Sequence, residues 1–458
     1  MKNFLVPPPH AEQLPEEHIN ATYKRLRLQV FVGIFTGYVG YYLVRRNFSL
    51  AMPYLLTLGF DKAELGFAFA CNATAYGFSK FIMGGISDRS DARKFMALGL
   101  VLSSCATMLA GTAFGTSSIV WMALFQALVG WFGGMGFPPG GRVIAHWFSV
   151  KERGTKWSFW NTSHNVGGGV LGIIAAWGVT FALSWGLAIG LSQRVGIFWL
   201  PAAIAVMLAI IVYLLVRDTP QSCGLPSIEK HRNDYPHNYG NHSETVLKTR
   251  DIVFKYVFFN KILWIVATAN AFVYFVRFGV LDWAPTYLTE VKHYNIKEMG
   301  LAYSLYEWAA IPGTILCGWL SDTVFKRNRA LTTMVYMALV LVAVFVYWKN
   351  VDNKLIDSIA LVSIGFLIYG PVLLINVHAV DLSSKNAAGA VTGFTGFFGY
   401  FFGTSLLANI VMGWVVQSYG WDAGFELLIT ACLLTIALLA VAHWQERRVC
   451  HTKQNDEG

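Results

Sequence analysis

The stretch Val30-Phe-Val-Gly-Ile-Phe-Thr-Gly-Tyr-Val-Gly-Tyr-Tyr-Leu-Val-Arg45-Arg46 decides how the rest of the chain is interpreted. In it, fifteen uncharged residues run into two adjacent arginines, and a second apolar segment follows as far as Leu58. A membrane helix needs roughly 20 apolar residues to cross about 30 Å of hydrocarbon. Neither segment spans alone, but joined they do, and Arg45 then lies well inside the membrane. A cation there costs about 2.5 to 3.5 kcal/mol on insertion scales, so it marks a candidate functional site.

The same arrangement recurs later in the chain. Fifteen uncharged residues, 262–276, run into Arg277, which follows Arg45 by 277 − 45 = 232 positions. A tyrosine precedes each arginine by three residues, Tyr42 in the first case and Tyr274 in the second. On a helix, this spacing places each tyrosine on the same face as its arginine. No carboxylate lies three or four residues from either arginine, so the two cations are predicted to bind an anion brought from outside.

The composition is that of a membrane protein with many spans. Hydrophobic residues make up 55% of the chain, charged residues 13%, and the mean hydropathy is +0.48. A soluble protein carries about 25% charged residues. The net charge of +9 lies mostly in loops on one predicted face, which is typical of cytoplasmic loops, so nucleic-acid binding is excluded. The six cysteines lack metal-ligand spacing and are interpreted as free thiols.

Hydropathy predicts twelve transmembrane helices and therefore an all-α membrane protein. Six are expected in residues 1–216, at about 29–57, 64–86, 94–113, 118–140, 158–184 and 195–216. Six more are expected in residues 258–458, at about 259–289, 297–319, 330–348, 356–379, 388–416 and 423–444, before a basic tail. Residues 217–257 are the one long hydrophilic segment and are interpreted as a cytoplasmic linker between two six-helix halves. Six spans per half return the chain to its starting side, so both termini are expected to be cytoplasmic.

Further matches extend the repeat beyond the arginines. Gly84-Gly-Ile-Ser-Asp88 corresponds to Gly318-Trp-Leu-Ser-Asp322 at a spacing of 322 − 88 = 234, and Ser149-Val-Lys151 corresponds to Ser383-Ser-Lys385 at the same spacing. An even number of spans per half gives two repeats of the same orientation, related by a pseudo-two-fold axis along the membrane normal. This is a transporter architecture in which the substrate lies between the halves near mid-membrane.

Under that symmetry, Arg45 and Arg277 are expected to face each other across the axis. A guanidinium group is planar, permanently charged and able to hold phosphate with two parallel hydrogen bonds. Two of them converging on one point suit a phosphate dianion. The alternative is that each arginine reaches the membrane interface or pairs with an acid on another helix.

Two further side chains could assist at such a site. Lys80 lies late in the second span and adds a third cation, although a lysine there can equally extend to the headgroups. His164 lies inside the fifth span and could donate to phosphate, and its alternative role is that of a hydrogen-bonded packing histidine.

Tyrosines within the spans could donate hydroxyl groups to the substrate, although aromatic residues are so frequent here that most serve packing. The candidates are Tyr38, Tyr42, Tyr274, Tyr369 and Tyr400. Only Tyr42 and Tyr274 are supported by the repeat.

Three acids are candidates for gating or coupling. Asp88 and Asp322 lie in the two Gly-x-x-Ser-Asp turns, where charges at helix ends could lock the halves together on one side or simply anchor the loops. Glu307, in the eighth span, is a candidate for proton coupling or for pairing with a cation. No phosphate-binding loop, metal cluster or nucleophile motif is present in the sequence, so no enzyme and no cofactor are predicted.

Nearly from end to end, the chain resembles the organophosphate:phosphate antiporters of the major facilitator superfamily. The resemblance is carried by runs such as Tyr41-Tyr-Leu-Val-Arg45, Gly77-Phe-Ser-Lys80, His164-Asn-Val-Gly-Gly-Gly169, Arg217-Asp-Thr-Pro-Gln-Ser-Cys-Gly-Leu-Pro226, Asp282-Trp-Ala-Pro-Thr-Tyr287 and Gly393-Phe-Thr-Gly-Phe-Phe-Gly-Tyr400.

This resemblance implies uptake of glycerol 3-phosphate in exchange for internal inorganic phosphate, by alternating access, in the bacterial inner membrane. It also implies that Arg45 and Arg277 bind the phosphate group and that Lys80 and His164 assist. Transporters of hexose phosphate or phosphoglycerate share the arginine pair, and membrane sensors of sugar phosphates share the fold, so these remain alternatives, as does a proton-coupled symporter. We expect the two phosphates and the lipid bilayer as partners, and a monomer.

Overall fold

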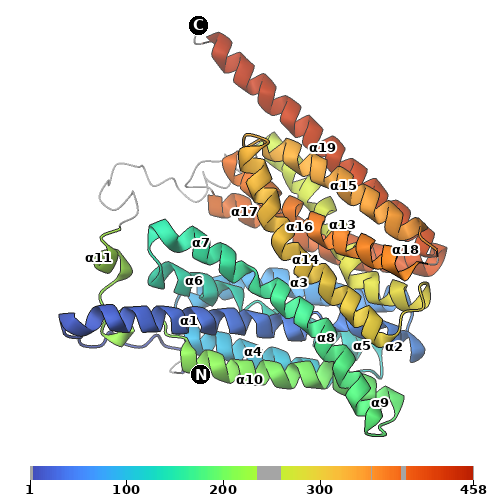
Figure 1. Cartoon of the computed structure of the whole chain (residues 1–458), viewed down its shortest axis with the longest axis horizontal. Helices are drawn as coiled ribbons and strands as arrows, with labels where there is room; N and C mark the ends of the chain where they lie inside the picture. Colours follow the sequence, from blue (N-terminus) through green and yellow to red (C-terminus); the bar gives the residue numbers. More distant parts are fainter. Residues whose placement is uncertain (1–3, 235–258, 352, 383–387, 457–458) are drawn as a thin grey trace. The chain divides into compact units, whose positions relative to one another are not determined.

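Every element in the described part of the chain is a helix, as predicted (Figure 1). The computed structural model describes residues 4–234, 259–351, 353–382 and 388–456. The chain forms two compact units, of which unit 1 comprises Met1–Ala51 and Thr74–Thr245 and unit 2 comprises Met52–Ala73 and Val246–Gly458. The linker prediction over 235–257 and the repeat match at Ser383–Lys385 lie outside the described residues.

Unit 1 contains the helices of the first part of the chain. These are α1 (Glu16–Arg45), α4 (Ala92–Ala110), α5 (Ile119–Gly133), α6 (Phe137–Trp147), α7 (Val150–Asn161), α8 (Ser163–Ser184), α9 (Ile189–Arg194), η1 (Val195–Trp199), α10 (Leu200–Leu215), η2 (Gln221–Cys223) and α11 (Ile228–Arg232). Helices α2 (Asn47–Thr57) and α3 (Lys62–Ser87) each begin in one unit and end in the other. In Figure 1, α1, α4 and α10 run side by side.

Unit 2 contains the helices of the second part of the chain. These are α13 (Lys261–Glu290), α14 (Ile296–Thr323), α15 (Arg329–Lys349), α16 (Lys354–Asp381), α17 (Ala388–Phe397), η5 (Phe398–Val411), α18 (Met412–Tyr419) and α19 (Trp421–Asp456). Helix α13 is the central element of this unit. Of its apolar 18-residue stretch, 72% is buried inside the protein, compared with 39% of the corresponding stretch of α19. It packs against α14, α16, η5 and α19.

The predicted spans are confirmed, with ends that extend beyond the apolar cores. Nine helical segments in the described residues are long and apolar enough to cross a membrane. The other three predicted spans correspond to α1 with α2, to α3 and to α14. Several predicted spans consist of two helices in succession, for example α5 followed by α6. The last helix continues to Asp456, well past the predicted end at 444.

The first span is broken at the arginine pair, whereas hydropathy predicts a single span over about 29–57. Helix α1 ends at Arg45, and Arg46 has φ −104° and ψ −4° before α2 begins. A helix end leaves carbonyl groups without partners in the helix. One of them, the carbonyl of Val44, accepts a hydrogen bond of 3.1 Å from the hydroxyl of Thr107. In the second half, α13 continues unbroken through Arg277, so the two repeats differ at this point.

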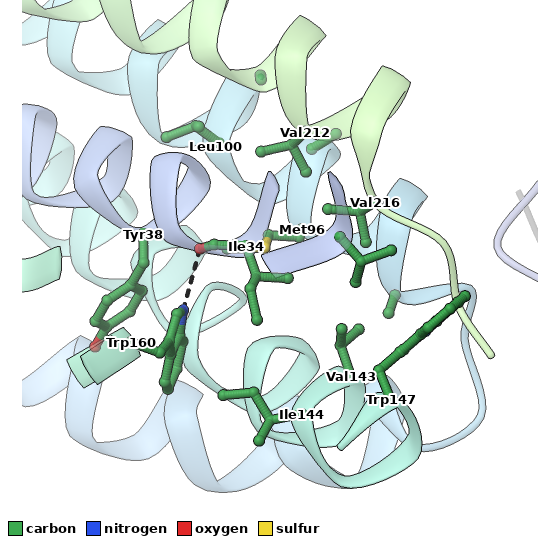
Figure 2. Packing of buried hydrophobic residues seen from close by; sticks show 14 of the residues in the cluster. Ile34, Tyr38, Met96, Leu100, Val143, Ile144, Trp147, Trp160, Val212 and Val216 are labelled. Carbon is green, nitrogen blue, oxygen red and sulfur yellow. Dashed lines mark hydrogen bonds between the residues drawn. The ribbon is translucent and has the colours of Figure 1, made fainter. Parts of the chain in front are cut away.

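The core of unit 1 lies where α1, α4, α6, α7 and α10 meet. Figure 2 shows Ile34, Met96, Trp147 and Val212 converging there, all of them buried. Trp160 is also fully buried, and its indole nitrogen donates to the carbonyl of Ile34 at 3.1 Å. A buried indole N–H needs such a partner, so this bond fixes the end of α7 against α1.

An ion pair between Asp218 and Arg142 stabilises unit 1 at the start of the predicted linker. Asp218 follows α10 and accepts hydrogen bonds from the backbone N–H of Ala92, at 2.9 Å, and from Arg142, at 3.0 Å. Arg142 also donates to the carbonyls of Ser87 and Ser90 at the end of α3. Burial raises the pKa of the Asp218 carboxyl, whereas the Ala92 N–H and Arg142 act to lower that pKa. One arginine thus ties α3, α6 and the start of the linker together.

In unit 2, the approach of α14 to α16 depends on Gly313. A Cβ at this position would lie 1.8 Å from the carbonyl oxygen of Phe366, so Gly313→Ala must push the helices apart. We expect a loss of about 1 to 3 kcal/mol in the stability of unit 2, measured as a lower melting temperature of the purified protein. Gly318→Ala is the matched control on the same helix, because nothing lies within 4 Å of its Cβ. Equal melting temperatures for the two variants would contradict the prediction.

Candidate functional site

In unit 1, the structure surrounds Arg45 with aromatic rings. Its guanidinium carbon lies 3.3 Å from the centre of the Tyr76 ring and 5.8 Å from that of Tyr42, and the residue is only 3% exposed. A cation over an aromatic face is attracted by the ring quadrupole, most strongly where water is excluded. Gly133 lies beside this stack, since a Cβ at its position would be in ordinary van der Waals contact with both Arg45 and Tyr76.

The predicted residues His164 and Tyr38 belong to the same aromatic cluster. The His164 ring lies 5.3 Å from that of Tyr42, and the Tyr38 ring lies 5.5 Å from it on the same helix. The Nδ1 atom of His164 is in hydrogen-bond contact with the carbonyl of Asn161, one turn earlier. Unit 1 therefore brings together four predicted residues, Arg45, Tyr42, Tyr38 and His164.

Lys80 is connected to this cluster through Phe137. Its ammonium group lies 3.9 Å from the centre of the Phe137 ring, and that ring lies 6.0 Å from the Tyr38 ring. Lys80 also lines a cavity of about 530 Å³ in unit 1, together with Asp88 and Arg142. The ammonium group thus lies at the edge of a space that a small solute can enter.

In unit 2, Arg277 has an equivalent environment. Its guanidinium carbon lies 4.0 Å from the centre of the Tyr369 ring, 4.5 Å from that of Phe278 and 6.0 Å from that of Tyr274. The residue is 5% exposed. Within the part of the chain that the structure describes, its Nε atom is buried and has no hydrogen-bond partner. A buried donor without an acceptor is costly in a protein, which favours an anionic ligand at this place.

The other predicted residues of unit 2 gather around this arginine. The hydroxyl of Tyr369 donates to the carboxylate of Glu307 at 2.8 Å. The Tyr400 ring lies 5.2 Å from that of Tyr274. Tyr369 therefore links Arg277 to Glu307, because its ring packs on the guanidinium group and its hydroxyl binds the carboxylate.

The two gating candidates have different surroundings. Asp88 is exposed at the end of α3 and lines the cavity with Lys80. Asp322 forms an ion pair of 2.7 Å with Arg329, which also approaches Asp381 at 3.6 Å. These contacts connect the ends of α14, α15 and α16 inside unit 2. The proposed lock between the halves therefore remains a prediction.

Two contributors to the clusters were missed in the sequence. Tyr76 makes the closest ring contact with Arg45, and Phe137 connects Lys80 to Tyr38. A signal for Tyr76 was available, because it precedes Lys80 by four residues and so shares its helix face. Phe137 carries no such signal, since one phenylalanine among 33 has nothing to distinguish it.

The fold and these buried cations define a membrane transporter with many helical spans. Residues 34–406 match the Major Facilitator Superfamily, and the chain belongs to that superfamily. A solved bacterial homologue of the human lysosomal transporter Spinster has the same fold, with a TM-score of 0.71 at 17% identity over 91% of this chain and 95% of that one.

The chain is also similar to named transporters over almost its whole length. It is 52% identical to the glycerol-3-phosphate transporter of Bacillus subtilis (strain 168), over 98% of this chain and 100% of that protein. It is 48% identical to the glycerol-3-phosphate transporter of Haemophilus influenzae, over 96% of each chain. The phosphoglycerate transporter protein of Salmonella typhimurium is 37% identical, over 97% of this chain and 95% of that one.

Proposed function

We propose that this protein takes up glycerol 3-phosphate in exchange for internal inorganic phosphate. The observation that carries the proposal is the pair of buried arginines at matching places in the two repeats, each packed on tyrosine rings. A guanidinium over an aromatic ring can keep its N–H edge available for hydrogen bonds, and that edge matches two phosphate oxygens.

In this proposal, the two arginines bind the phosphate group and the remaining candidates assist them. Arg45 and Arg277 each bind the phosphate group through a fork of N–H donors. Lys80, in its cavity, attracts the anion and guides it inward, and His164 and the tyrosines supply neutral donors. The related glycerol-3-phosphate transporters support glycerol 3-phosphate as the ester. We place the protein in the bacterial inner membrane as a monomer with both termini cytoplasmic.

Transport follows from alternating access in this proposal. The empty carrier holds two like charges whose repulsion favours binding of a dianion. Bound phosphate or ester neutralises them, and the halves then rock around the site. The outward gradient of phosphate drives uptake of the ester without a further energy source.

The test uses purified protein in liposomes loaded with inorganic phosphate. We expect uptake of labelled glycerol 3-phosphate that stops when internal phosphate is left out. Equal uptake in its absence, driven by a pH gradient, would indicate a proton-coupled symporter. Absence of any exchange, with specific binding of the ester retained, would indicate a sensor. Adding unlabelled hexose phosphate or phosphoglycerate at equal concentration, and measuring how far each reduces the uptake of labelled glycerol 3-phosphate, ranks the preference of the protein for these esters.

Removal of one hydroxyl tests the link between Tyr369 and Glu307. Tyr369→Phe keeps the ring over Arg277 and removes the donor to the carboxylate, and we expect exchange to fall about tenfold, because a hydrogen bond to a charged group contributes roughly 1.5 to 3 kcal/mol. Tyr294→Phe is the control, since it removes a hydroxyl bonded to the carbonyl of Lys354, outside the arginine cluster. Full exchange in Tyr369→Phe would exclude the hydroxyl from the site.

A further inference from the structure

Three phenylalanine rings lie together on the surface of unit 1, where the end of α7 lies next to α1 (Figure 1). The rings of Phe31 and Phe35 on α1 lie 6.5 Å apart, and the ring of Phe159 on α7 lies 6.0 and 6.1 Å from them. Phe159 is 61% exposed, and the two rings of α1 are half-buried. We call these three residues the phenylalanine patch. Leu28 and Val32, both exposed, precede the rings of α1 by three residues each and extend the same apolar face.

A lysine without a carboxylate partner lies beside the patch. The ammonium group of Lys156 lies 5.6 Å from the centre of the Phe31 ring and 5.8 Å from that of Phe148. Within the part of the chain that the structure describes, this ammonium group forms no ion pair. The nearby Arg27 lies 4.8 Å from the centre of the Phe148 ring, but its charge is neutralised by an ion pair with Glu152. The positive charge next to the patch is therefore that of Lys156.

The predicted spans place these residues at different depths in the membrane. Hydropathy begins the first span at about residue 29 and the fifth at about residue 158. The cations Lys24, Arg25 and Lys156 come just before these two starts, at the level of the lipid headgroups, whereas the phenylalanine patch comes just after them, at the level of the acyl chains. Lys24 and Arg25 are exposed, and neither is ion-paired with another described residue. Uncompensated positive charge and exposed rings thus follow each other along the membrane normal.

We propose that this surface binds an anionic phospholipid, whose phosphate is held by Lys156 and one of whose acyl chains lies on the phenylalanine patch. A phosphodiester carries a negative charge and accepts hydrogen bonds from an ammonium group. Charge complementarity selects an anionic lipid over a zwitterionic one, because a zwitterionic headgroup brings a cation of its own to a surface that is already positive. The inference does not depend on which solute the protein transports.

Native mass spectrometry of the full-length protein in detergent measures this binding. The protein is titrated with phosphatidylglycerol, which is anionic, and with phosphatidylcholine of the same acyl chains, which is zwitterionic. We expect one phosphatidylglycerol to bind about fivefold more tightly than phosphatidylcholine or better, since each cation near the surface contributes roughly this factor to the binding of an anionic lipid. Equal affinities for the two lipids would overturn the proposal.

A charge-removing variant locates the phosphate. Lys156→Gln is expected to lower the affinity for phosphatidylglycerol about fivefold and to leave that for phosphatidylcholine unchanged. Lys349→Gln is the matched control, because Lys349 also lies over an aromatic ring, that of Trp348 at 3.5 Å, but belongs to unit 2. Equal losses in the two variants would indicate general attraction to positive charge and would reject the site at Lys156.

A second variant locates the acyl chain. Phe159→Ala removes the most exposed ring of the patch and is expected to lower the affinity for both lipids roughly threefold, because the chain loses apolar contact whatever the headgroup. Phe81→Ala is the control, since Phe81 is 87% exposed and belongs to unit 1 but lies outside the patch. Unchanged affinities in Phe159→Ala would contradict the assigned position of the chain.

Inorganic phosphate distinguishes a lipid site from a site for free anions. A large excess of inorganic phosphate is expected to leave phosphatidylglycerol bound, because its acyl chains add to the affinity. Release of the lipid from the unmodified protein, but not from Lys156→Gln, would assign this lysine to a free anion and overturn the proposal.

Thermal unfolding provides an independent measurement. Without lipid, Lys156→Gln is expected to melt at the same temperature as the unmodified protein, because the replaced ammonium group has no ion pair among the described residues. Phosphatidylglycerol is expected to raise the melting temperature of the unmodified protein more than that of the variant, since a ligand stabilises the folded state in proportion to its binding. A rise of equal size in both proteins would count against Lys156 as the phosphate ligand.

Discussion

Arg277→Lys is expected to reduce phosphate exchange by at least 100-fold in liposomes while the protein remains folded. Lysine keeps the positive charge but has a compact ammonium group in place of the planar fork. It loses the second parallel hydrogen bond to phosphate, and an ammonium group lacks the planar face with which a guanidinium can stack on a ring such as that of Tyr369, whose centre lies 4.0 Å from the Arg277 guanidinium carbon. A 100-fold loss corresponds to about 2.7 kcal/mol, which is in the range of one bidentate charged contact.

Arg45→Lys is expected to give a loss of the same size, because Arg45 has the matching place in the first repeat and an even closer ring, that of Tyr76. The measurement is the initial rate of labelled phosphate exchange at equal amounts of reconstituted protein. Arg89→Lys provides the control, since Arg89 is exposed at the turn after α3. If either variant at the candidate site exchanged phosphate as fast as the control, a paired-guanidinium site would be rejected.

The fold was predictable because a membrane imposes a simple length rule on the sequence. Apolar runs of about 20 residues identify the spans whatever their partners, and the structure confirms them. Helix ends were less predictable. They extend past the apolar cores into polar residues that hydropathy does not count. At the break at Arg46, the carbonyl of Val44 accepts from the Thr107 hydroxyl, which comes from another helix.

In the candidate site too, contacts within one helix were predictable from the sequence, whereas contacts between different helices were not. Three-residue spacing correctly placed Tyr42 and Tyr274 within 6.0 Å of their arginines. The nearest rings, those of Tyr76 and Tyr369, come from other helices, and only tertiary packing brings them there. A repeat in the sequence reveals which positions are equivalent but not which helices meet at them.

The role of Asp218 was not predictable either, because its partners are also distant in the sequence. Its replacement has the largest expected effect on stability. In the sequence, Asp218 belongs to the predicted linker and to the run from Arg217 to Pro226 that carries the resemblance, and a single aspartate after a span has no periodic signal. The structure gives it two buried hydrogen bonds and the only described ion pair of Arg142. The side chains of the pair are 2% and 14% exposed, so water screens their interaction only slightly.

Asp218→Ala is expected to destabilise unit 1 by about 3 to 5 kcal/mol, because it leaves the guanidinium of Arg142 buried without a counter-charge. For a unit of this size, that loss lowers the melting temperature by roughly 10 °C. Thermal unfolding of the purified protein in detergent provides the measurement. Asp218→Asn is expected to lose less, since its amide oxygen can still accept from one of the two donors.

The paired replacement distinguishes the cost of an uncompensated charge from the loss of a favourable contact. Replacing both members by apolar side chains, Arg142→Met with Asp218→Leu, removes the charge together with its partner, and we expect it to recover much of the stability that Asp218→Ala loses. Recovery is expected to be incomplete, because the carbonyls of Ser87 and Ser90 lose their donor at the end of α3. Asp88→Ala, at an exposed position beside the pair, is expected to leave the melting temperature unchanged. A double variant as unstable as Asp218→Ala would contradict the prediction, because it would show that the uncompensated charge of Arg142 is not what destabilises the single variant.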